Sequence, residues 1–315
     1  MRLLVLGGTK LVGRDLATAA LAAGHEVTLF HRGITGLDVH PEAEHLLGDR
    51  DGGLEPLAGR TWDACVDVSG YEPRLVRASA EVLRASVARL VYVSTISVYA
   101  SLAEPTDESA PLSELPAGVD PDDFAWEHYG PLKALGERAV LDVFGERATV
   151  VRPGYVVGPH DHTGRFTWWV RRAARGGRMP VPASIHGRAQ FIDGRDLGAF
   201  LLRAAEAGLP GAYNATGPVP PVGMREVLEL AAAAAGADLE VVPVPDEEVA
   251  AAGVGYPLWV HDPGWSAWAE VDVSRALGVG LRFRPLRETV RDTLAEAPHV
   301  DGLWPSADDE ARLLG

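Results

Sequence analysis

The sequence predicts an α/β protein in which helices cover both faces of a parallel, doubly wound sheet. Short apolar runs typical of buried strands alternate with helical patterns through most of the chain. A glycine-rich turn also stands between the first strand pattern and the first helix pattern, which is typical of a Rossmann-type unit. A smaller, mixed lobe that binds the substrate is expected in the C-terminal part.

The first unit ends near residue 30. A strand pattern at residues 2–6 leads into the turn, and a helix closed by Gly24 and a strand at residues 26–30 follow. This order places the turn at a helix N-terminus, where backbone N–H groups bind the pyrophosphate of a dinucleotide. The turn residues expected to contact this cofactor are Gly7, Gly8, Thr9, Lys10, Leu11, Val12 and Gly13.

The residues that follow the second strand favour NADP(H) over NAD(H). An NAD site usually has an acidic residue there, but this sequence has Arg32, which suits a 2′-phosphate, and Lys10 can add a second positive charge. The alternative is that Arg32 is a solvated loop residue. Asp49 is expected either to bind the adenine amino group or to stabilise a turn, and Ser69 is expected to line the same site.

Strand and helix patterns continue to alternate beyond the first unit. Strands are predicted at residues 46–48, 63–70, 90–94, 149–152, 212–215 and 239–244, and helices at residues 73–87, 129–144, 166–178, 197–207, 224–235 and 286–294. The acidic stretch at residues 100–123 is predicted to be a surface loop that contributes to a flap over the site. The chain is expected to end in a polar tail.

Two sets of residues in the C-terminal half leave alternatives open. The arginines of the helix that starts at Phe166 either form a solvated face or reach an anionic substrate group; they are Arg171, Arg172, Arg175 and Arg178. A second set combines aromatic side chains with a histidine and is expected either in the core or in a pocket wall or lid; it contains Trp259, His261, Trp265 and Trp268.

Composition limits the classes of protein and partner. A chain of 315 residues that is 47% hydrophobic can fill a large core, and the single cysteine, Cys65, is expected to be buried. A net charge of −15 disfavours nucleic acids and anionic membranes as partners, so a small-molecule substrate is expected. Because we find neither a charged leader nor a long apolar span, we expect a cytoplasmic protein.

The chain is expected to divide into two parts. Residues 1–165 with residues 188–217 would form the NADP-binding domain, and residues 166–187 with residues 218–315 the substrate-binding lobe. No metal site is predicted, because His160, Asp161 and His162 stand in a loop whose spacing lacks the geometry of a dedicated site.

Tyr129 and Lys133 are the strongest candidates for catalysis. Residues four apart project from one face of a helix, and Pro131 places the start of that helix near Tyr129. The chain has 27 arginines but only two lysines, Lys10 and Lys133. Lysine is therefore expected only where a compact ammonium is needed. A neighbouring cation and a helix N-terminus would both favour the phenolate that proton exchange requires.

These motifs together resemble the extended branch of the short-chain dehydrogenase/reductase family, which contains NAD(P)-dependent epimerases, dehydratases and reductases. The resemblance covers nearly the whole chain. It extends to residues 7–13, 91–99, 129–133, 152–154, 158–159, 191–193 and 196–197.

The resemblance implies a role for each matched residue. Thr95, with Ser94 as its neighbouring alternative, would bind the substrate oxygen, and Tyr129 would transfer the proton. Lys133 would hold the nicotinamide ribose and lower the pKa of Tyr129, while hydride passes between the nicotinamide and the carbon that bears the oxygen. Pro153 and Gly154 would line the cofactor site, and a homodimer is the family's usual assembly.

Departures from the family pattern bear on the substrate. Ile96 and Ser97 replace the acidic pair of the dehydratases, and Tyr155 replaces an asparagine that many nucleotide-sugar enzymes carry. The leading hypothesis is therefore an NADP(H)-dependent oxidoreductase that acts on a carbonyl or alcohol carbon of a small, partly apolar metabolite. The alternatives are a nucleotide-sugar epimerase with tightly held cofactor and a non-catalytic NADP-binding scaffold.

Overall fold

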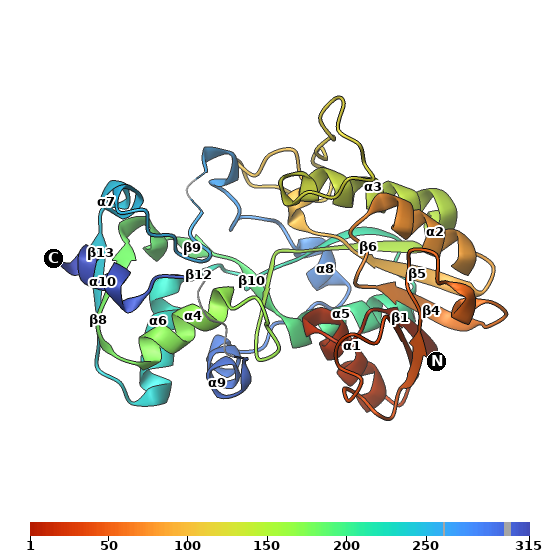
Figure 1. Cartoon of the computed structure of the whole chain (residues 1–315), viewed down its shortest axis with the longest axis horizontal. Coiled ribbons are helices and arrows are strands. Elements are labelled where there is room, and N and C mark those ends of the chain that lie inside the picture. The colour runs from red at the N-terminus through yellow and green to blue at the C-terminus, as the bar shows by residue number, and fades with distance from the viewer. Residues whose placement is uncertain (261, 299–303) are drawn as a thin grey trace.

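A computed structural model describes residues 1–260, 262–298 and 304–315. At its centre is a parallel sheet with the strand order β11-β6-β5-β4-β1-β2-β3 (Figure 1). The strands are β1 (Arg2–Leu6), β2 (Glu26–His31), β3 (Glu44–Leu47), β4 (Trp62–Asp67), β5 (Val87–Val93), β6 (Ala148–Pro153) and β11 (Gly211–Ala215). The predicted Rossmann-type, doubly wound parallel sheet is confirmed.

Helices cover both faces of this sheet. On one face α1 (Leu11–Ala22) packs against α5 (Gly194–Ala207), and on the other α2 (Pro73–Leu83) packs against α3 (Tyr129–Phe144). Strand β1 is apolar from Leu3 to Leu6 because both of its faces are covered. Leu3 and Val5 join the hydrophobic cluster of α1, whereas Leu4 and Leu6 join that of α2. Cys65 is buried and unbonded, as predicted.

A smaller, mixed lobe has a hydrophobic cluster of its own. Its helices are α4 (Arg165–Ala174), α6 (Met224–Ala235), α7 (Asp246–Ala251), α9 (Leu286–Glu296) and α10 (Ala307–Leu314), whereas α8 (Ser274–Gly278) packs on β11 (Figure 1). Its strands pair as β7 (Tyr155–Val157) with β10 (Phe191–Asp193), β8 (Gly177–Pro182) with β13 (Leu239–Val244), and antiparallel β9 (Arg188–Ala189) with β12 (Val222–Gly223). The exact domain boundaries stay a prediction.

The polar tail predicted for the C-terminus is wrong. Residues Ala307–Leu314 form helix α10, which begins with a capping box between Ser306 and Asp309. The carboxylate of Glu310 pairs with Arg172 of α4 at 2.5 Å, and this long-range contact fixes the helix. The helix predicted at residues 73–87 also ends earlier, at Leu83, because Val87 starts β5. No helix in the described parts of the chain is long and apolar enough to cross a membrane.

Candidate active site

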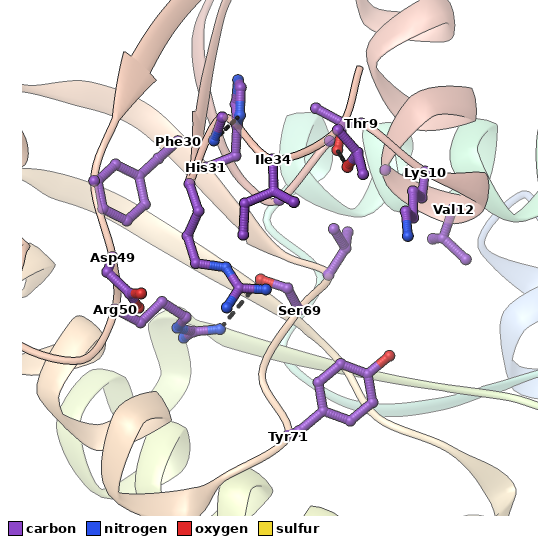
Figure 2. Close-up of a pocket in the computed structure, with 18 of the residues that line it drawn as sticks. Thr9, Lys10, Val12, Phe30, His31, Ile34, Asp49, Arg50, Ser69 and Tyr71 are labelled. Atoms are coloured by element: carbon purple, nitrogen blue, oxygen red, sulfur yellow. Dashed lines mark hydrogen bonds between the residues drawn. The ribbon is translucent and has the colours of Figure 1, made fainter. Parts of the chain in front are cut away.

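The glycine-rich turn and the ends of β1, β2 and β4 enclose a pocket of about 690 Å³ (Figure 2). The pocket lies between β1 and β4, where the chain order reverses and where open α/β sheets bind ligands. The residues proposed from sequence that line it are Gly7, Gly8, Thr9, Lys10, Leu11, Val12, Gly13, Arg32, Asp49 and Ser69. Segments far apart in the sequence thus surround one cavity.

Close backbone contacts explain the glycines of the turn. A Cβ atom on Gly13 would lie 2.6 Å from the Cα of Gly8, and one on Gly8 would lie 2.7 Å from Cδ2 of Leu29. Lys10 stands where the usual motif has a glycine, and its extended backbone (φ −134°) accepts a side chain. The positive φ falls instead on Leu11, at 27°. The glycines of the turn have no side chains, so a ligand can approach the backbone closely. This suits a pyrophosphate bound by backbone N–H groups.

Positive charge is available at the rim of the pocket. Arg32 and Lys10 are exposed, and within residues 1–260, 262–298 and 304–315 their side chains have no hydrogen-bond or ion-pair partner. Unpaired cations that line a cavity in an acidic protein fit an anionic ligand. Asp49 also lines the pocket, and its Oδ1 accepts the N–H of Asp51 at 3.0 Å, so it stabilises a turn.

Sequence analysis missed a buried ion pair on this pocket. Arg50 donates to both carboxylate oxygens of Asp67, at 2.8 and 2.6 Å. It also donates to Ser69 at 3.4 Å (Figure 2). The Asp67 side chain is only 2% exposed. The position of Asp67 at the end of an apolar strand could have indicated a site residue. Its partner, Arg50, lies 17 residues away, and only the fold brings the two together.

Thr95 and Ser94 follow β5 and face different surroundings. Thr95 caps the short 3-10 helix Ile96–Val98, and its Oγ1 accepts the N–H of Ser97 at 3.1 Å. Ser94 instead donates to the buried carboxylate of Glu137 at 2.5 Å. Because successive residues of an extended chain project to opposite sides, Thr95 is the one that reaches Tyr129.

Tyr129 begins α3, as Pro131 predicted. Burial and the nearby Tyr71 raise the pKa of Tyr129 to about 12, while hydrogen bonding with Thr95 and the charge of Arg165 act in the opposite direction. The prediction that Lys133 lowers this pKa is therefore wrong for the protein without cofactor, because loss of hydration outweighs the nearby cations. The phenol keeps its proton at neutral pH.

Lys133 is buried at the ends of two strands. Its Nζ donates to the carbonyl oxygens of Gly70 and Val93, both at 2.6 Å, and lies 4.1 Å from the ring centroid of Tyr92. The pKa of Lys133 is lowered to about 7, mainly by burial; the carboxylate of Asp67 acts to raise it and the charge of Arg50 to lower it. A protonated ammonium has three N–H groups, so one remains for a ligand.

A buried polar network supports this side of the site. Glu137 of α3 accepts two hydrogen bonds from Arg152, at 2.9 and 2.6 Å, and Arg152 donates to the Tyr99 hydroxyl at 3.1 Å. Tyr99 in turn donates to Asn214 at 2.6 Å. The network fixes α3 against β6 and β11, and with it the position of Tyr129.

Five of the proposed site residues do not line the 690 Å³ pocket; they are Thr95, Tyr129, Lys133, Pro153 and Gly154. Tyr71 connects the two regions, because it lines the pocket and its ring centroid lies 6.2 Å from that of Tyr129. Pro153 ends β6. A Cβ on Gly154 would lie 2.3 Å from Oγ1 of Thr216, so only glycine allows the chain to pass this close to Thr216.

The helix predicted at residues 166–178 ends at Ala174, so Arg178 lies in β8 instead, while Arg171 and Arg172 of α4 support the fold. Arg171 donates to the backbone oxygen of Pro298 and Arg172 to that of Arg178. A different arginine, Arg165, approaches the site; it lies over the ring of Tyr155 at 5.1 Å, and its charge acts on the pKa of Tyr129. This arginine was missed because it starts the helix rather than belonging to its polar stripe.

The tryptophan-rich segment packs mainly as core. Trp268 is buried and contacts the ring of Tyr155 at 5.3 Å, and Trp265 packs against the lobe's hydrophobic cluster, as does Trp259. His261 lies outside the described residues. In the described part of the chain, no group of three His, Cys, Asp or Glu side chains is arranged to hold a metal ion.

The parallel sheet, its switch-point pocket and its glycine turn define a dinucleotide-binding α/β protein. Residues 71–216 match the profile of the NAD dependent epimerase/dehydratase family. This segment, just under half of the chain, is similar to that family, which agrees with the resemblance found in the sequence.

Three relatives share 29% identity with the chain. The chloroplast stem-loop binding protein of 41 kDa b of Arabidopsis thaliana matches over 64% of this chain and 54% of its own length, so the match spans about half of that protein. The 2-alkyl-3-oxoalkanoate reductase of Stenotrophomonas maltophilia (strain K279a) matches over 75% and 76%. The 4-hydroxy-2-methyl-3-oxo-4-farnesyl-3,4-dihydroquinoline-1-oxide ketoreductase of Stigmatella aurantiaca matches over 82% and 81%.

Two solved structures share the fold. The Bordetella bronchiseptica enzyme WbmH in complex with NAD+ has a TM-score of 0.66 and 19% identity, over 94% of this chain and 97% of that one. RMD from Pseudomonas aeruginosa, complexed with NADPH, has a TM-score of 0.63 and 22% identity, over 94% and 98%. One of these neighbours was solved with NAD+ and the other with NADPH.

Proposed function

We propose that this protein is an NADP(H)-dependent reductase of a carbonyl group on a small, partly apolar metabolite. The observation that carries the proposal is the contact of Thr95 with Tyr129 at the end of β5, joined through Tyr71 to the glycine-turn pocket. Two of the relatives are named as reductases of oxo compounds with alkyl or farnesyl groups, which supports a carbonyl substrate with apolar parts.

Each residue has a separate task in the proposed mechanism. The nicotinamide, when bound, supplies the hydride. Thr95 orients the substrate oxygen by a hydrogen bond, and the phenol of Tyr129 gives its proton to that oxygen. A phenol whose pKa is about 12 is protonated at neutral pH and is still far more acidic than an alcohol, so the transfer is downhill. Lys133 would offer its third N–H to a ribose hydroxyl.

The test of the proton donor is Tyr129→Phe, which keeps the ring contacts and removes the hydroxyl. We expect kcat for NADPH-dependent reduction of diketones to fall by roughly 10²–10⁴-fold, the usual effect of losing an acid catalyst. The dissociation constant for NADPH should change by less than about twofold. Tyr213→Phe, on the outer strand β11, is the control and should keep wild-type kcat. Unchanged turnover in Tyr129→Phe would reject the assignment.

The test of the cofactor is Arg32→Ala. Arg32 lines the pocket and has no partner among the described residues, so we expect wild type to bind NADPH more tightly than NADH by about tenfold or more, and the variant to lose that preference. Fluorescence titration of both cofactors measures it. Arg225→Ala, on the exposed face of α6, should keep the preference. Equal affinities in wild type would remove the 2′-phosphate assignment.

An epimerase with tightly held cofactor is the competing proposal, and the family match keeps it open. It requires cofactor that survives purification and conversion of sugar-nucleotide epimers without added NADPH. Cofactor that exchanges freely, together with stoichiometric NADPH oxidation, separates the reductase from it. If the protein were a non-catalytic scaffold, Tyr129→Phe would leave its function unchanged. The test of the proton donor therefore also tests the scaffold hypothesis.

A further inference from the structure

Four aromatic rings gather at the start of α3. Tyr71, Phe124, Trp126 and Tyr129 form this aromatic cluster, and their neighbouring ring centroids lie between 5.1 and 6.2 Å apart. Tyr71 precedes α2, whereas Phe124 and Trp126 come from the end of the acidic loop. Two separate segments therefore present aromatic rings to the proposed proton donor.

Two large rings of the cluster, Trp126 and Tyr71, are unusually exposed to solvent. Trp126 is 73% exposed and Tyr71 is 45% exposed, and in the described part of the chain the other large exposed hydrophobic side chains are aliphatic. None of the three rings around Tyr129 belongs to the hydrophobic cores of the sheet or the smaller lobe. Folding gains little from a tryptophan held in water, so the cluster is better explained by a ligand that covers it.

The cluster is fixed relative to the reacting groups. Trp126 lies in a 3-10 helix, Trp126–His128, that runs directly into α3 at Tyr129. Tyr71 lines the cofactor pocket (Figure 2). Its ring centroid lies 6.2 Å from that of Tyr129. A molecule that stacks on the cluster therefore borders the cofactor pocket on one side and the Tyr129 phenol on the other.

We infer that the aromatic cluster binds a planar ring of the carbonyl substrate and so makes the enzyme selective for aryl or conjugated ketones. This inference rests on the proposed reductase function. Aromatic rings carry a negative face and a positive edge, so offset or edge-to-face contacts favour another ring over an alkyl group of similar size. Trp126 and Tyr71 are thus substrate-binding residues.

The test compares 1-phenyl-1,2-propanedione with 2,3-butanedione, which differ by a phenyl group in place of a methyl group. We expect wild type to reduce the phenyl diketone with a kcat/KM at least about tenfold higher. Trp126→Ala should lower kcat/KM for the phenyl diketone by about tenfold and leave that for butanedione within about twofold, while Trp126→Phe should restore most of the selectivity. Leu141→Ala, an exposed side chain later on α3, is the matched control.

Binding gives a second readout that does not depend on turnover. The NADPH-loaded Tyr129→Phe variant should bind the phenyl diketone more tightly than butanedione in ligand-observed NMR, and adding Trp126→Ala should remove the difference. Equal binding of the two diketones, or selectivity unchanged by Trp126→Ala, overturns the inference. A failure of the reductase proposal appears separately, as NADPH oxidation that does not depend on the Tyr129 hydroxyl.

Discussion

Two backbone carbonyl oxygens determine what the side chain at position 133 can be. Lys133 is 3% exposed and its Nζ lies 2.6 Å from the oxygens of both Gly70 and Val93. Such a space fits a compact ammonium on a slender stem and leaves no room for a planar guanidinium. This explains why one of the two lysines in an arginine-rich chain stands here.

Lys133→Arg should therefore destabilise the protein although it keeps a positive charge. We expect the free energy of unfolding to fall by about 2 kcal/mol, because the larger group overpacks a closed space. Urea unfolding followed by circular dichroism measures it. Lys10→Arg, at the exposed start of α1, is the control and should stay within about 0.5 kcal/mol. Equal stability of the two variants would contradict this account of the site.

Single residues show how far the sequence alone can lead. Spacing and Pro131 correctly predicted that Tyr129 starts a helix, and lysine scarcity pointed to Lys133. The pKa of Tyr129 was predicted in the wrong direction, because it depends on burial and on Tyr71, 58 positions earlier in the chain. Local patterns carry dihedral preferences, whereas hydration and long-range charge pairs appear only in the folded chain.

At the scale of elements, the glycine turn holds β1 and α1 close enough to form the pocket floor. Gly13 lies in the first turn of α1 and faces the backbone of Gly8, so the turn folds back on itself without intervening side chains. The positive φ of Gly8, 102°, also requires glycine. The geometry of the turn therefore depends on contacts between backbone atoms.

Gly13→Ala should disturb this turn. A Cβ would lie 2.6 Å from the Cα and 2.7 Å from the N of Gly8, and backbone atoms cannot move aside cheaply. We expect a loss of about 2 kcal/mol in stability and at least about tenfold weaker NADPH binding. Thermal unfolding and fluorescence titration measure the two effects. Gly278→Ala, whose Cβ would meet nothing within 4 Å, should leave both unchanged.

For the molecule as a whole, a charged network joins the sheet to the smaller lobe. Asp193, at the end of β10, accepts hydrogen bonds from Arg195 at 2.8 Å and from Thr289 of α9 at 2.8 Å. Arg195 also pairs with Asp292 of α9 at 2.6 Å, and Arg284 pairs with Asp196 of α5 at 2.8 Å. Helices on opposite sides of the junction are thus held by one buried carboxylate.

Asp193→Asn should weaken this junction. The change removes a buried negative charge and leaves Arg195 and Arg284 without full compensation, so we expect stability to fall by about 3 kcal/mol. Chemical denaturation monitored by tryptophan fluorescence measures it. Asp142→Asn, in an exposed pair with Arg77, should cost less than about 1 kcal/mol. Similar losses in both variants would show that the network contributes no more than a surface pair.

The two parts of the molecule differed in how well the sequence predicted them. The inner strands of the large sheet, such as β1 and β4, are buried on both faces and appear as apolar runs, so the order of the elements was predicted correctly. In the smaller lobe, β8 and β13 contain prolines, and β9 and β12 each have two residues. Such strands depend on tertiary pairing, and helix α10 depends on the contact of Glu310 with Arg172.

The 3-10 helix Trp126–His128 continues directly into α3. This continuity limits which insertions and deletions the site could accept during evolution. The segment before the first aromatic ring is itself fixed to the fold, because Thr106 bridges to Val271 and Glu108 accepts the N–H of Asn214. A change of length between Trp126 and Tyr129 would rotate the helix by about 100° per residue and carry the phenol away from Thr95. New substrate ranges in related lineages should therefore arise by exchange of side chains at positions 124 and 126, at constant length.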